Sequence, residues 1–199
     1  MTDIMTNAPV VLDLETQKLF SEVDGRRHQL KVSVVGIYDY ASNHYEAFEE
    51  REIPRLESCL RKASFLIGFN IRDFDLEVLK PYLLTSLEEV AVLDLLEEIE
   101  QSRGHRVSLE SIALATLKEG KSGSGLEAVQ LYRDGRIEEL KQYCLDDVRL
   151  TRKIYEYGKE HGKVLFLSQK DGRIHEIQVS WATWEPERPQ KNTFPSSLF

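Results

Sequence analysis

Cysteine is scarce in this chain, and long apolar runs are missing altogether. The two cysteines among 199 residues, Cys59 and Cys144, lie far apart in predicted helices and indicate buried thiols in a reducing compartment, not a disulfide. The five histidines show no zinc-ligand spacing. No apolar run approaches the roughly 18 residues of a membrane span, and the N-terminus lacks the basic and apolar stretches of a signal peptide. These absences predict a soluble cytoplasmic protein.

The chain also lacks an excess of positive charge. It has 26 Lys and Arg residues against 34 Asp and Glu residues, which gives a formal net charge of −8. This is the wrong sign for gripping nucleic acid by bulk electrostatics, so a tight scaffold-type DNA binder is disfavoured. The argument is weaker against an enzyme that holds a few nucleotides at metal ions, because bound cations reverse the local sign.

Hydrophobic residues make up 41% of the chain, enough for one sizeable core. Alternating or short apolar runs predict five strands, at residues 10–15, 31–38, 44–48, 65–69 and 90–93. Apolar spacing of three and four predicts helices at residues 53–63, 74–83, 95–101, 109–117, 126–132 and 137–161. A strand hairpin followed by strands that alternate with helices indicates an α/β fold, with a mixed five-stranded sheet and helices on both faces.

A different pattern follows the longest predicted helix. Asp171-Gly172 lies between two alternating runs, which is a strong signal for a C-terminal β-hairpin. The two predicted strands are residues 164–168 and 173–181. The proline-containing tail from Glu185 has the composition of a loosely ordered segment. We therefore expect one domain over residues 1–163, and a hairpin and tail over residues 164–199 that pack on it or extend it.

Four acidic residues and a tyrosine lie in three short segments: at the end of a predicted strand, after a turn that precedes a helix, and within the longest predicted helix. Asp13 and Glu15 are two residues apart at the end of the first strand, so the strand period of two points both to one face. Asp75 follows the turn after a buried strand, and Tyr143 and Asp147 are one turn apart on the longest helix. Crowded carboxylates repel one another unless a metal neutralises them, and hard divalent cations prefer such oxygen clusters.

Each of these residues has an ordinary structural explanation when taken alone. An Asp-x-Glu pair is commonly a solvated strand end, and Asp75 suits the first turn of a helix because of the helix dipole. Tyr143 taken alone is a half-buried aromatic residue. Among their neighbours, Asp146 points about 100° away from Asp147 on the helix, and Asp73 and Asp94 are expected to cap helices. The joint order of the motifs is much harder to obtain by chance.

The motifs Asp-x-Glu, Asn-x-x-x-Phe-Asp and Tyr-x-x-x-Asp together resemble the DEDD-type 3′–5′ exonucleases of the ribonuclease H-like fold, in their tyrosine subclass. The histidine subclass has His where this chain has Gln142. The run 123–128, followed by Tyr143-Cys144 and Asp147-Val148, is similar to the small YprB-like bacterial ribonuclease H-like domains. The resemblance covers roughly residues 10–155.

This resemblance implies a two-metal mechanism with Mg²⁺ or Mn²⁺. Asp13, Glu15 and Asp147 would hold one ion, and Asp13 would bridge to a second ion on which Asp75 acts. Tyr143 would orient the attacking water as a positioning hydroxyl, since its ordinary pKa near 10 makes it a poor base at neutral pH.

The resemblance also implies a substrate, nucleic acid with a free 3′ end, as single-stranded DNA or RNA. On the substrate side, Thr16 would offer its backbone N–H to the terminal nucleotide, and Asn70 would orient Asp75 or cap the following helix. The segment 16–30 is expected to be a loop. There Arg26 and Arg27, with Lys31 beyond them, either line a path for a single strand or belong to a solvated surface.

Two other functions are compatible with this fold. A catalytically silent ribonuclease H-like module would recruit a helicase or polymerase partner, but a structural role would not need four converging carboxylates, each costly when unpaired. An endonuclease or junction resolvase would normally use a purely acidic set without the tyrosine. The choice between DNA and RNA, the strictness of the 3′–5′ polarity and the oligomeric state stay open at this point.

Overall fold

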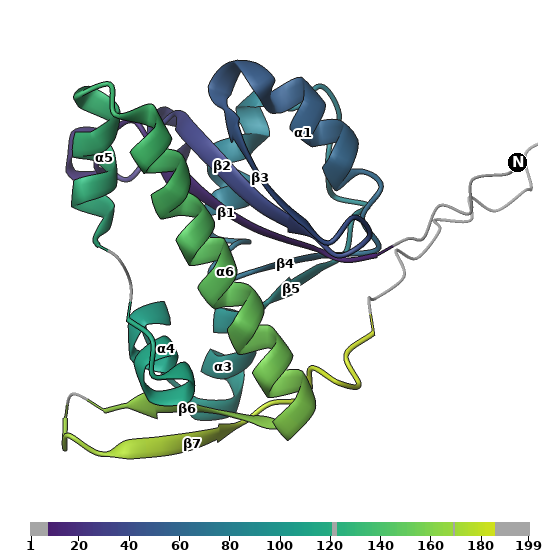
Figure 1. Ribbon diagram of the computed structural model, residues 1–199, viewed down its shortest axis with the longest axis vertical. Coiled ribbons are helices and arrows are strands. Elements are labelled where there is room, and N and C mark those ends of the chain that lie inside the picture. Colours follow the sequence, from purple (N-terminus) through teal and green to yellow (C-terminus); the bar gives the residue numbers. More distant parts are fainter. Residues whose placement is uncertain (1–7, 121–122, 169, 186–199) are drawn as a thin grey trace, which may run out of the picture.

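The computed structural model describes residues 8–120, 123–168 and 170–185, and it contains the expected mixed five-stranded sheet (Figure 1). The strand order is β3-β2-β1-β4-β5. β1 is antiparallel to β2, and β2 to β3, whereas β1 and β4 are parallel, as are β4 and β5. The strands are β1 Val10–Thr16, β2 Val32–Asp39, β3 His44–Glu49, β4 Leu66–Gly68 and β5 Val92–Asp94. The α/β fold class predicted from the sequence is confirmed.

In the part of the chain that the structure describes, six α-helices cover the two faces of this sheet (Figure 1). They are α1 Ile53–Leu60, α2 Asp75–Leu79, α3 Leu95–Arg103, α4 Leu109–Leu117, α5 Gly125–Arg133 and α6 Ile137–His161. Side chains of α1 and α2 form one core with the sheet, and side chains of α3, α4 and α6 form a second core on the opposite face. Within the described residues, no helix is both long enough and apolar enough to cross a membrane.

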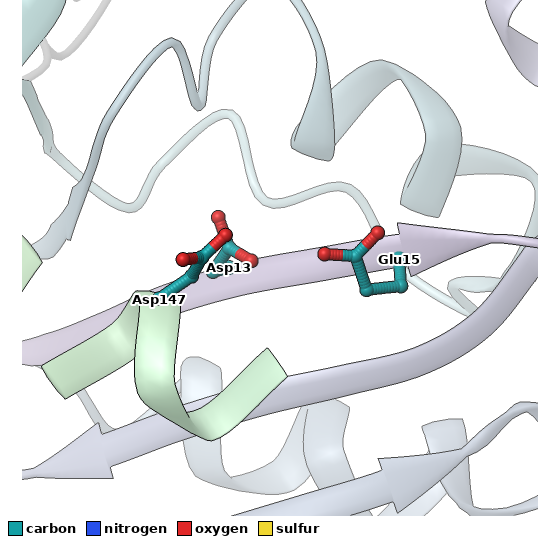
Figure 2. A group of neighbouring side chains, drawn as sticks. All are labelled: Asp13, Glu15 and Asp147. Carbon is teal, nitrogen blue, oxygen red and sulfur yellow. The ribbon is translucent and has the colours of Figure 1, made fainter. Parts of the chain in front are cut away.

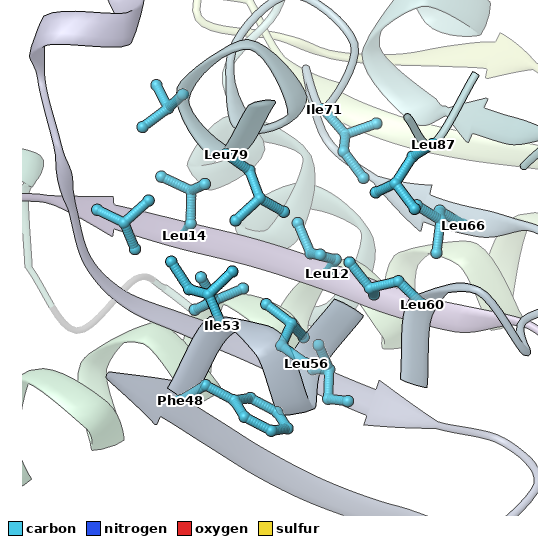
Figure 3. Close-up of a cluster of buried hydrophobic side chains, with 14 of the residues drawn as sticks. Leu12, Leu14, Phe48, Ile53, Leu56, Leu60, Leu66, Ile71, Leu79 and Leu87 are labelled. Atoms are coloured by element: carbon cyan, nitrogen blue, oxygen red, sulfur yellow. The ribbon is translucent and has the colours of Figure 1, made fainter. Parts of the chain in front are cut away.

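The alternation along β1 divides its side chains between these two faces. Leu12 and Leu14 are buried in the core under α1, beside Ile53 and Leu56 (Figure 3). Burying a leucine contributes about 1.5–3 kcal/mol, so these two residues determine which face of β1 packs against α1. A one-residue slip would exchange the two faces. Asp13 and Glu15 are thereby directed to the opposite face, the one that α6 covers.

Helix α6 crosses the sheet and packs on β1 and β2 (Figure 1). Gly36 of β2 lies directly opposite Asp13 in the strand register. A Cβ at this glycine would lie 3.0 Å from both Cys144 Sγ and Val148 Cγ2 of the helix. The missing side chain therefore allows α6 to approach the sheet closely at the row that carries Asp13.

The C-terminal strands form a separate two-stranded antiparallel sheet, as expected from the Asp-Gly turn. β6 (Lys163–Leu167) and β7 (Ile174–Gln178) pack on α4, α6 and α3. β7 ends three residues earlier than predicted, because its partner β6 begins at Lys163. One further backbone bond, from the Val179 N–H to the Gly162 carbonyl, continues the register before Trp181 folds into the core. Apart from Glu185 itself, the proline-containing tail predicted from residue 185 lies outside the described residues.

Three local predictions are corrected by the structure. The helix expected over residues 74–83 is split into α2 and a 3-10 turn over Lys80–Tyr82, because Pro81 cannot supply a helical N–H. The expected cap from Asn70 or Asp73 is wrong, since the N-cap of α2 is Phe74, whose side chain cannot accept a hydrogen bond. The segment expected to be a loop contains two 3-10 turns, Phe20–Glu22 and Arg27–Gln29.

Candidate metal centre

Three of the predicted carboxylates meet between β1 and α6. Asp13 and Glu15 reach this point from β1, and Asp147 reaches it from the middle of α6, where its side chain is only 2% exposed (Figure 2). One carboxylate oxygen from each residue lies within 4.8 Å of the others. Such crowding of negative charge favours a bound cation, and three carboxylates are hard oxygen ligands suited to a divalent ion such as Mg²⁺ or Mn²⁺. These residues can therefore hold a metal.

Asp75 lies beside this group in a different environment. It is the first residue of α2, is 3% exposed, and accepts a hydrogen bond of 2.9 Å from the backbone N–H of Leu14. That N–H is available because β4 pairs with β1 only as far as Val11. Burial, followed by repulsion from Asp13, raises the pKa of the Asp75 carboxyl well above its usual range. Its role as a ligand of the second ion stays a prediction.

The turn that delivers Asp75 is organised by Asp94, at the end of β5. Its carboxylate accepts hydrogen bonds from the backbone N–H groups of Asn70 (2.9 Å) and Arg72 (3.0 Å). It also caps α3 by accepting from Leu96 and Glu97, which confirms its predicted capping role. One buried carboxylate thus ties the β4–α2 turn to the neighbouring strand. The sequence indicated the cap but not the tie to the turn.

Tyr143 lies one turn before Asp147 on α6 and is buried, with its ring against Gly123. Burial, then the negative charges of Glu15 and Asp147, raise the pKa of its hydroxyl far above its ordinary value. The tyrosine therefore keeps its proton at neutral pH and can donate a hydrogen bond. This agrees with the predicted positioning role, which itself stays a prediction.

Cys144 is a site neighbour that sequence reasoning missed. Its Sγ lies 3.4 Å from the backbone carbonyl of Asp13 and 4.0 Å from the Asp13 carboxylate. Burial, with the charges of Asp13 and Glu15, raises the pKa of this thiol well above its usual range, so it is a neutral group packed under the acids. Both cysteines are free, as predicted, but only Cys144 is buried, whereas Cys59 is partly exposed. The sequence feature that could have identified Cys144 as a neighbour of the site is its helical spacing of three from Asp147.

Comparison with known proteins agrees with this architecture. Residues 10–158 match the model of the family described as the RNase_H superfamily. The chain belongs to the RNase H superfamily. No curated protein matches it in sequence.

A similar structure is that of the family B DNA polymerase from the hyperthermophilic archaeon Pyrobaculum calidifontis. The TM-score is 0.58 at 17% sequence identity, and the match covers 75% of this chain and 24% of the polymerase chain. The chain thus spans about a quarter of that polymerase, and the likeness at this identity concerns the fold.

Two further predicted site residues of this RNase H domain have hydrogen-bond partners within the fold. Asn70 has a positive φ of 68°, and its side-chain oxygen accepts a hydrogen bond from the guanidinium of Arg106. The N-cap of α2 is Phe74, so Asn70 does not cap this helix, and its role in orienting Asp75 stays a prediction. Thr16 is buried, and its hydroxyl donates to the Lys18 carbonyl at 2.8 Å. Their predicted contacts with substrate stay predictions.

Proposed function

We propose that this protein is a metal-dependent 3′–5′ exonuclease that hydrolyses single-stranded DNA or RNA. The observation that carries the proposal is the convergence of Asp13, Glu15 and Asp147 within 4.8 Å, with Asp75 and Tyr143 beside them. Membership of the RNase H superfamily supports a nuclease, and the fold likeness to a DNA polymerase favours nucleic acid as the substrate. The tyrosine subclass and the closeness to YprB-like domains are part of this proposal.

The four carboxylates and Tyr143 have different roles in the proposed reaction. Asp13, Glu15 and Asp147 would hold one Mg²⁺ or Mn²⁺ ion, and Asp75, with Asp13, would serve a second. When bound, such ions act as Lewis acids on the attacking and leaving oxygens of a phosphodiester. Tyr143 keeps its hydroxyl proton and orients the attacking water. The two free thiols suit a reducing compartment, and we place the protein in the cytoplasm.

The deciding experiment uses end-labelled single strands of DNA and RNA with Mn²⁺, and then with EDTA. We expect stepwise, metal-dependent shortening in which a 5′ label stays on the shortened strands and a 3′ label is released at the first step. A circular single strand, which has no end, should remain intact. Cutting of the circle would indicate an endonuclease instead. If every substrate survived in Mn²⁺, a silent module that recruits a helicase or polymerase would replace the exonuclease.

Metal binding should also stabilise the fold, because the ions bind the assembled carboxylates and not the unfolded chain. At a free Mn²⁺ concentration 100 times the Kd, the gain is about 2.7 kcal/mol, which corresponds to roughly 5–10 °C in Tm. The measurement is a melting curve in Mn²⁺ and in EDTA. Asp147→Asn should lose most of the shift. Asp146→Asn, a matched control whose carboxylate pairs with Arg149 at 3.6 Å, should keep it. Identical parental curves in Mn²⁺ and EDTA would contradict the metal site.

Tyr143→Phe separates the hydroxyl from the ring. The ring keeps its packing against Gly123, so the Mn²⁺-induced shift in Tm should survive, while kcat falls by roughly 10²-fold through loss of one proton-handling group. Tyr155→Phe is the control, since Tyr155 is buried on the same helix but stacks on Trp181. Unchanged turnover in Tyr143→Phe would make Tyr143 a packing residue and the tyrosine subclass wrong.

A further inference from the structure

The ring of Tyr143 packs against helix α5. Tyr143 is 7% exposed and belongs to a small buried cluster with Val34 of β2 and Ala128 of α5. Helix α5 lies beside α6, which carries Tyr143, and it also contacts β1, which carries Asp13 and Glu15 (Figure 1). The position of α5 therefore determines the space that the tyrosine ring can occupy next to the acids.

The connection that enters α5 is closely packed at a glycine. A Cβ at Gly123 would lie 3.1 Å from Cε2 of Tyr143 and would overlap the Glu127 carboxylate. Tyr143 and Glu127 thus both reach the space that a side chain at position 123 would fill. A Cβ at Gly125, the first residue of α5, would meet no atom within 4 Å. Of these two glycines, only Gly123 is closely packed.

The Glu127 carboxylate fastens this connection. It accepts a hydrogen bond of 2.7 Å from the backbone N–H of Ser124, the N-cap of α5. Such a bond is half of a capping box, and it satisfies an N–H that the helix itself leaves unpaired. The carboxylate also acts on the tyrosine, because burial and then the charges of four acids, Glu127 among them, raise the pKa of the Tyr143 hydroxyl. One side chain is therefore both the cap of α5 and a neighbour of Tyr143.

We propose that Glu127 is a positioning residue for Tyr143, because it fixes Gly123 against the ring and so keeps the hydroxyl directed at the attacking water. This inference rests on the proposed function and adds Glu127 to it. A tyrosine orients water only while its ring keeps one orientation, and a displacement of about 1 Å in an active site can cost roughly 10²-fold in rate. Glu127 acts on the reaction through Tyr143 and not as a metal ligand.

Kinetics of Glu127 variants test this role. Glu127→Ala should lower kcat roughly tenfold and leave KM within about twofold, as for loss of an interaction made in the transition state. Glu127→Gln keeps an oxygen that can accept from the Ser124 N–H, so it should retain at least about half of the parental kcat. Glu52→Ala is the matched control, because Glu52 accepts from the Glu49 N–H at 3.0 Å just before α1. Parental kcat in Glu127→Ala, or glutamine as damaging as alanine, would overturn the proposal.

A cycle with Tyr143→Phe separates positioning from general damage. If Glu127 acts through the hydroxyl, Glu127→Ala should lower kcat by less than about twofold once that hydroxyl is gone. Gly123→Ala should behave in the same way, because its methyl group would press on the ring. Gly125→Ala should keep the parental kcat, because its methyl group meets nothing within 4 Å. An undiminished loss of kcat in the Tyr143→Phe background would contradict the positioning role.

Fluorine NMR reports the state of the ring without requiring turnover. The chain has eight tyrosines, so after labelling with fluorotyrosine the Tyr143 signal is identified by its absence from Tyr143→Phe. In EDTA, this signal should shift or broaden in Glu127→Ala and stay at its parental position in Glu127→Gln and Glu52→Ala. A signal that is the same in Glu127→Ala and in the parent would show that Glu127 does not orient the ring.

The kinetic and NMR results also separate this inference from the exonuclease proposal. If the parent cleaves from the 3′ end but neither kcat nor the fluorine signal responds to Glu127→Ala, only the positioning role is wrong. If the signal responds but no metal supports cleavage by the parent, the exonuclease proposal is wrong and the orientation of Tyr143 by Glu127 stands.

Discussion

Asp13→Ala should lose at least about 10³-fold in metal-dependent nuclease activity, since a bound ion contributes several kcal/mol of transition-state stabilisation. Asp13 contributes a ligand oxygen to the three-carboxylate group, and its charge also raises the pKa of both Asp75 and the Cys144 thiol. Asp13 therefore affects both the three-carboxylate group and Asp75. Removing its charge relieves repulsion, so the Tm in EDTA should be equal to that of the parent or higher.

The measurement combines the end-label assay with melting curves in EDTA and in Mn²⁺. The variant should lose both activity and the Mn²⁺-induced shift in Tm. Asp146→Ala serves as a matched control, because it removes an acid from the same helix that pairs with Arg149 instead. Parental activity in a folded Asp13→Ala protein would remove the basis of the exonuclease proposal.

Trp181→Ala should destabilise the protein by about 3–5 kcal/mol, the usual range for removing a large buried aromatic residue. For a chain of this size, the Tm should fall by roughly 6–20 °C. Trp181 is 2% exposed, and its ring fills the space over Gly158 on α6. It connects the end of the C-terminal hairpin to the helix that carries Asp147 and Tyr143.

A substitution at Gly158 tests the contact between Trp181 and α6 more directly. Alanine normally stabilises a helix by about 1 kcal/mol relative to glycine, but a Cβ at this position would overlap the Trp181 ring. Gly158→Ala alone should therefore destabilise, by about 1–3 kcal/mol. In the Trp181→Ala background the same change should be neutral or stabilising, because the overlap is gone. Denaturant titrations of the four proteins give the coupling energy. Additive effects would show that Trp181 does not pack on Gly158.

Much of the site follows from short-range periodicity, which a sequence displays directly. The alternation of Leu12, Asp13, Leu14 and Glu15 determines which side chains enter the core and which face α6, because a strand repeats every two residues. The spacing of Tyr143 and Asp147 places both on one side of a helix, because four residues make about one turn. The α/β fold follows from the same kind of local pattern, repeated along the chain.

The tertiary structure alone decided what depends on contacts between distant residues. The Asp75 carboxylate bonds to a backbone group 61 residues away, and the Cys144 thiol lies against a carbonyl 131 residues away. No local period encodes such pairs. The hydrogen bond from the Arg106 guanidinium to the Asn70 side chain, 36 residues away, is of the same kind. Phe20 shows this limit most clearly, because only the fold of a segment expected to be a plain loop brings its ring to that of Phe74.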